Sequence, residues 1–218
     1  MKDIKIVKAK RKNIKSFSKV LFKSFKKESG TRYIFNYSDK ESRMFLFKAF
    51  LLRNTLRFRS GQVFLAKSNN KIVGGAVLYK DSRHLSIKKI VLFLPEVIKI
   101  IPKISVLKVI SILRLRWLDK QINQEYYTLE VLAVDSNYQR RGIGSKILSK
   151  VLSVAEKRSM GIYLTTASKK NERFYKKFGF KTIQRKVGEG IVIYHMYKKF
   201  YGIDFLSKKC KLNYNAKS

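Results

Sequence analysis

A glycine-containing turn, Gln139 to Gly144, separates two segments of different periodicity. The preceding apolar run, Thr128 to Val134, is typical of a buried strand, and the following segment, Ser145 to Arg158, has the spacing of an amphipathic helix. The first backbone N–H groups of a helix lack partners within the helix, and the helix dipole favours an anion beside them. The pattern therefore predicts a site that holds a phosphate group.

The side chains of this turn fit the same interpretation. Gly142 and Gly144 would let the backbone approach a ligand closely, because neither has a side chain to stand in the way. Arg140 and Arg141 add fixed positive charge at the same point. A glycine pair after a strand is a weak signal by itself, since most such pairs only form a tight turn. The elements around the turn must therefore be considered with it.

The periodicity of the whole chain predicts a single mixed α/β domain. Strands are predicted at 4–9, 63–67, 72–79, 126–134, 162–166, 181–185 and 191–197, and helices at 14–27, 40–59, 87–101, 102–118, 145–158 and 171–178. Gly74 and Gly75 fall within a predicted strand and indicate a bulge or a close backbone approach. We interpret residues 1–200 as one domain with a helical insertion at 82–124, followed by a basic tail at 201–218.

The charge of the chain is strongly positive, with 50 Lys and Arg against 14 Asp and Glu and a net charge of +36. One interpretation is an acidic partner, either nucleic acid or an anionic membrane surface. The other, which we favour, is a lysine-biased composition, because the basic residues run along the whole chain. The sequence contains neither a paired Cys/His zinc module nor an RNA-binding strand with stacking aromatics.

The remaining composition favours a cytoplasmic protein. Cys210 is the single cysteine, which excludes an intramolecular disulfide and fits a reducing compartment. The N-terminus lacks the apolar core of a signal peptide. The most apolar region, 87–118, is interrupted by charged residues and by Pro95 and Pro102, which argues against a membrane span.

Two motifs in this order of elements resemble the GNAT superfamily of acetyl-CoA-dependent N-acyltransferases. The family's turn signature is Gln or Arg, two residues, Gly, one residue, then Gly or Ala, and Gln139, Gly142 and Gly144 match it. Its second element is an Asn that opens a helix, then Phe-Tyr and Gly-Phe, as in Asn171 to Phe180. The resemblance covers about 126–197 and implies a mixed, mostly antiparallel sheet flanked by helices, with a helical insertion before the central cofactor-binding strand.

The resemblance implies acetyl-CoA as co-substrate. The pyrophosphate would lie on backbone N–H groups of the turn, and the pantetheine arm would lie along the end of the preceding strand and bond Asn171. A helix N-cap is the alternative role for Asn171. The cofactor-binding residues implied in this way are Leu132, Ala133, Val134, Gln139, Arg140, Arg141, Gly142, Ile143, Gly144, Ser145, Asn171, Phe174 and Tyr175.

The implied chemistry is direct attack of a primary amine on the thioester. The backbone N–H of Val134 is the candidate donor to the oxyanion. Tyr175 matches the family tyrosine that donates a proton to the leaving thiolate, and its alternative role is a packed aromatic. Glu130, in an otherwise apolar strand, is the candidate base, and a salt bridge to a lysine is its equally weighted alternative. His84 and His195 have no metal-ligand spacing, and we expect no metal. His195 lies in the last predicted strand and belongs to either the core or the cleft.

The acceptor and the role of the insertion stay open at this level. The apolar residues of 82–124 predict a helical pair packed on the domain or on a second subunit, ahead of a lid over the pocket or a basic surface for anionic lipid. A positive cleft would suit acidic or neutral amines better than polycations. The alternative function is a catalytically silent GNAT-fold protein that binds CoA or associates with nucleic acid. A homodimer is compatible with the resemblance.

Overall fold

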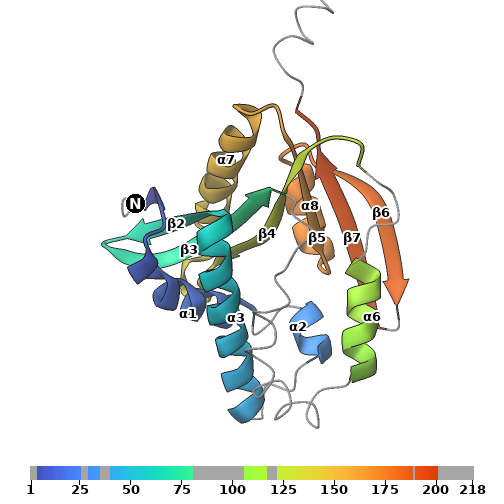
Figure 1. Cartoon of the computed structure of the whole chain (residues 1–218), viewed down its shortest axis with the longest axis horizontal. Helices are drawn as coiled ribbons and strands as arrows, with labels where there is room; N and C mark the ends of the chain where they lie inside the picture. Colours follow the sequence, from blue (N-terminus) through green and yellow to red (C-terminus); the bar gives the residue numbers. More distant parts are fainter. Residues whose placement is uncertain are drawn as a thin grey trace, which may run out of the picture.

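The computed structural model describes residues 4–25, 29–34, 40–80, 106–116, 122–188 and 190–200, whose elements all join or cover one sheet (Figure 1). The strands are β1 (Ile4–Lys8), β2 (Gln62–Ser68), β3 (Lys71–Lys80), β4 (Tyr126–Val134), β5 (Gly161–Thr166), β6 (Lys181–Gly188) and β7 (Ile191–Lys198). The helices are η1 (Arg11–Asn13), α1 (Ile14–Phe25), α2 (Ser29–Ile34), α3 (Lys40–Ser60), α6 (Val106–Arg116), η3 (Ser136–Tyr138), α7 (Ile143–Glu156) and α8 (Lys169–Lys176).

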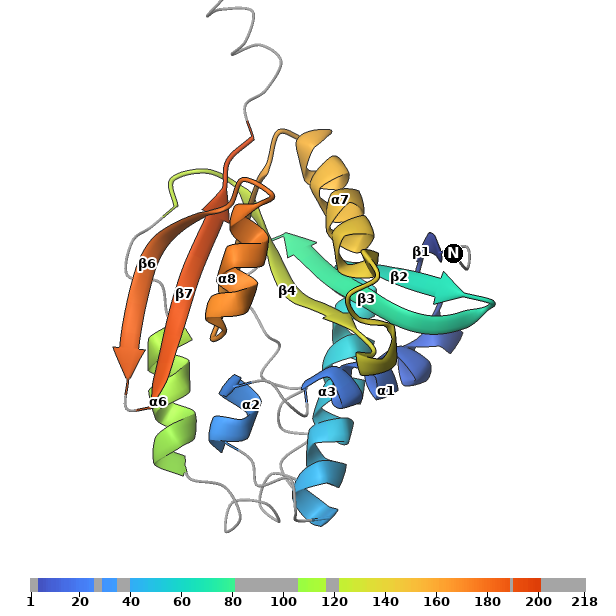
Figure 2. The ribbon, with the colours of Figure 1, turned by 180° about the vertical axis from the view of Figure 1, so that it is seen from behind.

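The seven strands have the order β1-β2-β3-β4-β5-β7-β6, and every neighbouring pair is antiparallel except β4 and β5. The parallel register of that pair covers only 126–128 against 161–163, although β4 continues to Val134 and β5 to Thr166. The two strands therefore diverge, and the sheet opens between them (Figure 2). The mixed, mostly antiparallel sheet flanked by helices is confirmed.

Two adjacent glycines of β3 seat helices on opposite faces of the sheet. A Cβ on Gly74 would lie 3.1 Å from Ile147 of α7 and 2.8 Å from the Ala133 carbonyl. A Cβ on Gly75 would lie 2.6 Å from the Phe17 ring of α1. The close approach predicted for this pair is confirmed, and it brings both helices against the strands that lead to the glycine turn.

The predicted elements within the described residues agree with the structure apart from their ends, and the short 3-10 helices η1 and η3 were not predicted. Helix α7 begins at Ile143 rather than Ser145, and α8 begins at Lys169 rather than Asn171. The short helix α2 was not predicted. The predicted helix 87–101 and the tail 201–218 lie outside the described residues, whereas the second helix of the insertion is present as α6.

Helix α6 packs against β6 and β7, and a buried histidine helps to hold it there. His195 is fully buried, its Nε2 lies 2.8 Å from the Leu115 carbonyl, and its Nδ1 lies 2.7 Å from the Tyr163 hydroxyl. A carbonyl only accepts, so Nε2 carries a proton and donates it. His195, which the sequence placed in either core or cleft, is a core residue, and the described part of the insertion is packed on the domain.

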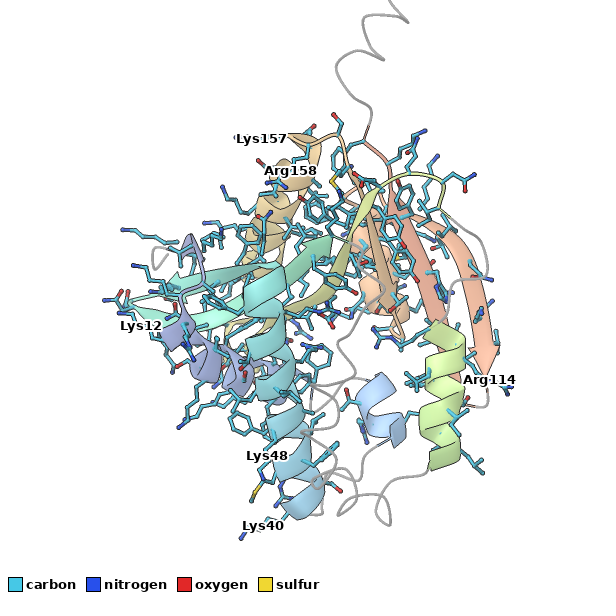
Figure 3. The ribbon with its side chains drawn as sticks, in the orientation of Figure 1. Lys12, Lys40, Lys48, Arg114, Lys157 and Arg158 are labelled. Carbon is cyan, nitrogen blue, oxygen red and sulfur yellow. The ribbon has the colours of Figure 1, made fainter. Side chains whose placement is uncertain are left out.

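Basic side chains lie at several separate edges of the fold. Lys12, Lys48, Arg114 and Lys157 are labelled at separate edges of the molecule in Figure 3. This distribution agrees with the compositional interpretation of the net charge of +36. Within the described residues, no helix is both long and apolar enough to cross a membrane.

A buried carboxylate in α8 makes the stability of the fold sensitive to acid. Glu172 is buried, and its Oε1 accepts from Lys176 Nζ at 2.7 Å and from Thr182 Oγ1 at 2.8 Å. The bond from Lys176, and then that from Thr182, lowers the pKa of Glu172 below its ordinary 4.5, against an opposing effect of burial. Because the pKa of Glu172 is lower in the folded protein than in the unfolded chain, the ionised carboxylate stabilises the fold when the pH is above the ordinary pKa. This stabilisation is lost as the pH falls through the lowered pKa.

We therefore expect Glu172→Gln to lower the free energy of unfolding by about 1–2 kcal/mol at pH 7. The difference from the wild type should shrink below pH 4.5, where the wild-type carboxylate begins to take up a proton in the unfolded chain. Urea unfolding at pH 7 and at about pH 3.5 measures both quantities. Glu125→Gln is the control, since its exposed pair with Lys80 should contribute less than about 1 kcal/mol. Equal losses for Glu172→Gln at both pH values would contradict the expectation.

Candidate active site

The glycine turn has a backbone conformation that leaves the start of α7 open. Arg140 (φ 62°) and Gly142 (φ 72°) are both left-handed, and Gly142 is the N-cap of α7 with no side-chain cap. The helical ladder begins with Lys146 N donating to the Gly142 carbonyl at 3.0 Å. The N–H groups of Ile143, Gly144 and Ser145 precede it and are those a helix leaves unpaired. The turn can therefore hold an anion as the sequence predicted.

The end of β4 turns some of its backbone groups into the opening of the sheet. Asp135 N donates to the Val73 carbonyl of β3 at 2.8 Å. Successive residues of a strand face alternate edges, so the N–H groups of Val134 and Leu132 face the β5 side. The Val134 carbonyl already accepts from Ser24 Oγ at 2.9 Å and from Gln139 Nε2 at 3.1 Å. Gln139 thus ties the turn back to the strand.

Asp135, which follows β4, has a structural role at the start of the glycine turn. Asp135 is only 5% exposed. Its Oδ1 accepts from Asn137 N at 3.1 Å and caps η3, and Lys23 lies 4.0 Å from its Oδ2. The carboxylate therefore fixes the path of the chain from β4 into the glycine turn.

Glu130 lies at a β-bulge in the middle of β4. The register passes from Val77 opposite Val131 to Leu78 opposite Leu129, so Glu130 is the extra residue. Its Oε2 accepts from Arg57 Nε at 2.9 Å, and both side chains are largely buried. Arg57 also lies over the Tyr79 ring at 3.7 Å. The salt bridge we considered for Glu130 is present, with an arginine of α3 rather than a lysine as the partner.

Tyr175 projects from α8 into the space between the diverging strands. Its ring is buried and packs edge-on against Phe174 and Phe180. Burial raises the pKa of its hydroxyl well above the ordinary value of 10. Within the described residues, the hydroxyl has no hydrogen-bond partner. Tyr175 is therefore a phenol that stays protonated and faces a cavity.

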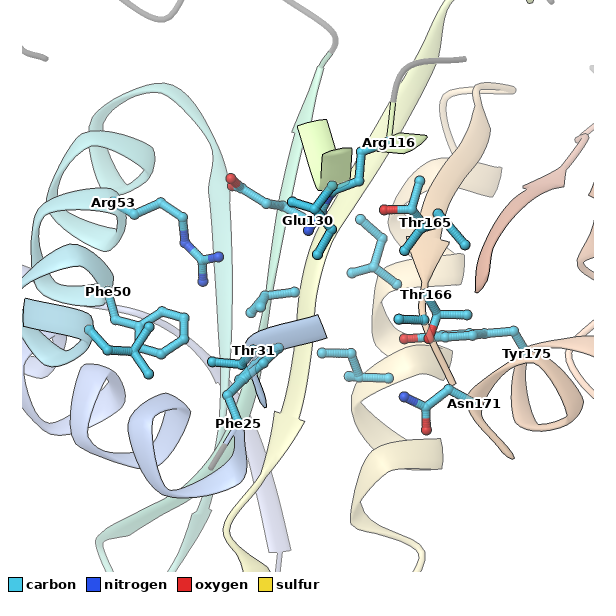
Figure 4. Close-up of a pocket in the computed structure, with 17 residues that line it drawn as sticks. Phe25, Thr31, Phe50, Arg53, Arg116, Glu130, Thr165, Thr166, Asn171 and Tyr175 are labelled. Carbon is cyan, nitrogen blue, oxygen red and sulfur yellow. The ribbon is translucent and has the colours of Figure 1, made fainter. Parts of the chain in front are cut away.

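Asn171 is not the helix cap that the sequence offered as its alternative role. Ser168 caps α8, and its Oγ accepts from Asn171 N at 3.3 Å. The Asn171 side chain lies at the cavity instead (Figure 4). The sequence did not distinguish Asn171 from Ser168 as the N-cap, because serine and asparagine are both favoured at that position. The Asn171 amide is thereby available to a ligand.

These groups meet in a cavity of about 220 Å³ at the opening between β4 and β5. Its polar lining residues are Thr31, Arg53, Arg116, Glu130, Thr165, Thr166, Asn171 and Tyr175. Figure 4 shows Arg53 entering from the α3 side and Tyr175 from the opposite side. Sequence reasoning missed Arg53, Arg116 and the two threonines of β5. In a chain with 50 basic residues, no arginine stands out before the fold places it.

The structure distributes the predicted cofactor residues along one path from the cavity to the turn. Leu132 lines the cavity, and a Cβ on Gly144 would lie 3.8 Å from the Phe174 ring and 3.9 Å from Val134. The side chains of Ala133 and Ile143 are buried in the core, so these two residues offer only backbone groups. Arg140, Arg141 and Gly142 are exposed. Within the described residues, no group of His, Cys, Asp and Glu is arranged to hold a metal ion.

A family model described as an acetyltransferase (GNAT) domain matches residues 106–182. This part of the chain is similar to a GNAT domain. The matched region runs from α6 to the start of β6 and contains Glu130, the glycine turn, Asn171 and Tyr175. No curated protein sequence matches the chain significantly.

Solved structures of acetyltransferases share the fold of this chain. Arylalkylamine N-acetyltransferase 2 from Aedes aegypti superposes with a TM-score of 0.68 at 16% identity, over 91% of this chain and 100% of the other. A structure titled histone acetyltransferase HPA2 and related acetyltransferase, from Corynebacterium glutamicum, has a TM-score of 0.66 at 18% identity, over 93% and 98%. PaiA N-acetyltransferase from Thermoplasma acidophilum, in complex with coenzyme A, has a TM-score of 0.58 at 14% identity, over 91% and 99%. At these identities the likeness concerns the fold.

Proposed function

We propose that this protein is an N-acyltransferase that moves an acetyl group from acetyl-CoA to a primary amine by direct attack. The observation that carries the proposal is the opening between β4 and β5, which has the uncapped start of α7 at one end and Tyr175 in a cavity at the other. The CoA bound in the PaiA structure supports the choice of cofactor. The cytoplasm supplies both acetyl-CoA and the reducing conditions that suit a chain with one cysteine.

The cofactor would lie along the path that the site residues define. Its pyrophosphate would accept from the N–H groups of Ile143, Gly144 and Ser145, with Arg140 and Arg141 nearby. The pantetheine arm would take the place of a strand beside β4, bonded by Leu132 and by the Asn171 amide. The thioester would then reach the cavity that Tyr175 lines.

In the reaction, the neutral amine nitrogen attacks the thioester carbonyl carbon and forms a C–N bond. The Val134 N–H, which faces this opening, would donate to the oxyanion. The C–S bond then breaks, and the Tyr175 hydroxyl would give its proton to the leaving thiolate. Glu130, held by Arg57, would take a proton from the amine directly or through water.

Calorimetric titration with acetyl-CoA, followed by a thiol-release assay with a panel of primary amines, tests the proposal. We expect one cofactor per chain, bound with an affinity that falls less than about threefold from low to moderate salt, because the site is built for the anion rather than for charge alone. Thiol should be released at the rate at which the amine is acetylated. Binding without transfer to any amine would favour the catalytically silent alternative. Binding abolished by salt would show only the attraction of a chain of net charge +36 for a polyanion.

A further inference from the structure

The guanidinium of Arg53 lies in the lining of the cavity. Its Nε and Nη2 atoms are buried, and neither makes a hydrogen bond within the described residues. The Phe50 ring lies 5.1 Å from its central carbon and covers one side. Buried guanidinium donors that remain unpaired are costly, so their presence at a cavity indicates a ligand that supplies acceptors.

The charge of the cavity also favours a negatively charged ligand. Glu130 is the single carboxylate among the residues that line it, and its Oε2 is bonded to Arg57. Arg53 and Arg116 line the cavity as well, and burial and the charge of Arg116 lower the pKa of Arg53 against the opposing effect of Glu130. Figure 4 shows the two arginines approaching from α3 and α6, on either side of Glu130. The lining residues therefore carry more positive than negative charge.

We propose that the acceptor carries a carboxylate beside its amine, and that Arg53, with Arg116 opposite, binds this carboxylate. The proposal rests on the acyl transfer proposed above and names its substrate class, a small amino acid with an apolar body. Phe25, Leu46, Phe50 and Ile112 supply the apolar wall. A guanidinium presents paired N–H donors that match the two oxygens of a carboxylate. The cavity volume of about 220 Å³ favours a small acceptor.

The experiment compares phenylalanine, phenylalanine amide and 2-phenylethylamine as acceptors, with kcat/KM corrected for the fraction of neutral amine at the assay pH. We expect the wild type to prefer phenylalanine over the amide by about tenfold or more. Arg53→Leu should abolish this preference by raising the KM for phenylalanine, and Arg53→Lys should retain part of it. Arg114→Leu removes the same charge from the exposed side of α6 and should leave the preference intact. The proposal is overturned if the wild type shows no preference or if Arg53→Leu keeps it.

Equilibrium binding separates this proposal from the proposed reaction. N-acetylphenylalanine and its amide are titrated into the CoA-bound wild type and Arg53→Leu, which requires no turnover. If the wild type binds N-acetylphenylalanine more tightly than its amide and Arg53→Leu does not, the proposal is supported even if no amine is acetylated. Equal binding of acid and amide by the wild type overturns it even if acetyl transfer is observed. Phosphoethanolamine against ethanolamine is the second pair, and a preference confined to the phosphate would also overturn the assignment of a carboxylate.

Discussion

Gly142→Trp should bind acetyl-CoA at least about 100-fold more weakly than the wild type, whereas Gly190→Trp should bind it as the wild type does. Both glycines are left-handed, with φ of 72° at Gly142 and 71° at Gly190, so each substitution imposes a similar backbone strain of about 1–2 kcal/mol. A Cβ on Gly142 meets no protein atom within 4 Å, and the indole would occupy the open space at the start of α7. The pyrophosphate is expected in that space.

Comparing Gly142→Trp with Gly190→Trp distinguishes an effect on the cofactor site from a general effect on stability. Gly190 lies in the turn between β6 and β7, and a Cβ there would come no closer than 3.9 Å to Tyr33. Calorimetry gives the dissociation constants, and thermal unfolding should show similar decreases in the two variants. If both variants bind acetyl-CoA as tightly as the wild type, the cofactor does not lie on this turn.

Tyr175→Phe should lower kcat by about 100-fold or more and leave the dissociation constant of acetyl-CoA unchanged, because it removes only the proton donor. The fold should tolerate the change, since the ring contacts with Phe174 and Phe180 remain and the hydroxyl has no partner within the described residues. The measurement is steady-state thiol release with a saturating amine. A decrease of less than about threefold would mean that water supplies the proton.

The control is a second buried tyrosine. Tyr127→Phe removes a hydroxyl that accepts from Arg158 Nη1 at 2.8 Å, at the end of β4 away from the turn. It should lower stability by about 1 kcal/mol and leave kcat unchanged. The pH dependence adds an independent test, because the raised pKa of Tyr175 keeps its acid form present at alkaline pH. The wild-type kcat should therefore show no decrease from this group between about pH 7 and pH 9.5.

Local patterns were sufficient to predict most of the elements and the cofactor end of the candidate site. Strand β4 was predicted with the bounds that it has, because its alternation is that of a strand with one buried face. The glycine turn was recognised because it lies between a strand and a helix, and two left-handed residues now account for its shape. The errors concerned ends of elements and short helices: Ser168 rather than Asn171 caps α8, since both residue types favour that position.

The acceptor end of the site could not be predicted in the same way. Glu130 was selected as a carboxylate in an apolar strand, but its partner Arg57 is 73 positions earlier on another element. Arg53 and Arg116 reach one cavity from α3 and α6, and nothing in their local sequence distinguishes them from the other basic residues. His195 was undecided until the structure placed Leu115 of the insertion against it.

The sequence alone therefore determined most of the order of the elements and the turn that can hold a phosphate, whereas the resemblance to the GNAT superfamily supplied the tyrosine proposed as proton donor. These features depend on residues close together in the chain, whose spacing is read directly. The tertiary structure decided which side chains share the cavity, which carboxylate is paired, and which guanidinium has buried N–H groups without a hydrogen bond to the described residues. Those features depend on the divergence of β4 from β5 and on helices from distant segments, and pairing across such distances leaves no local pattern.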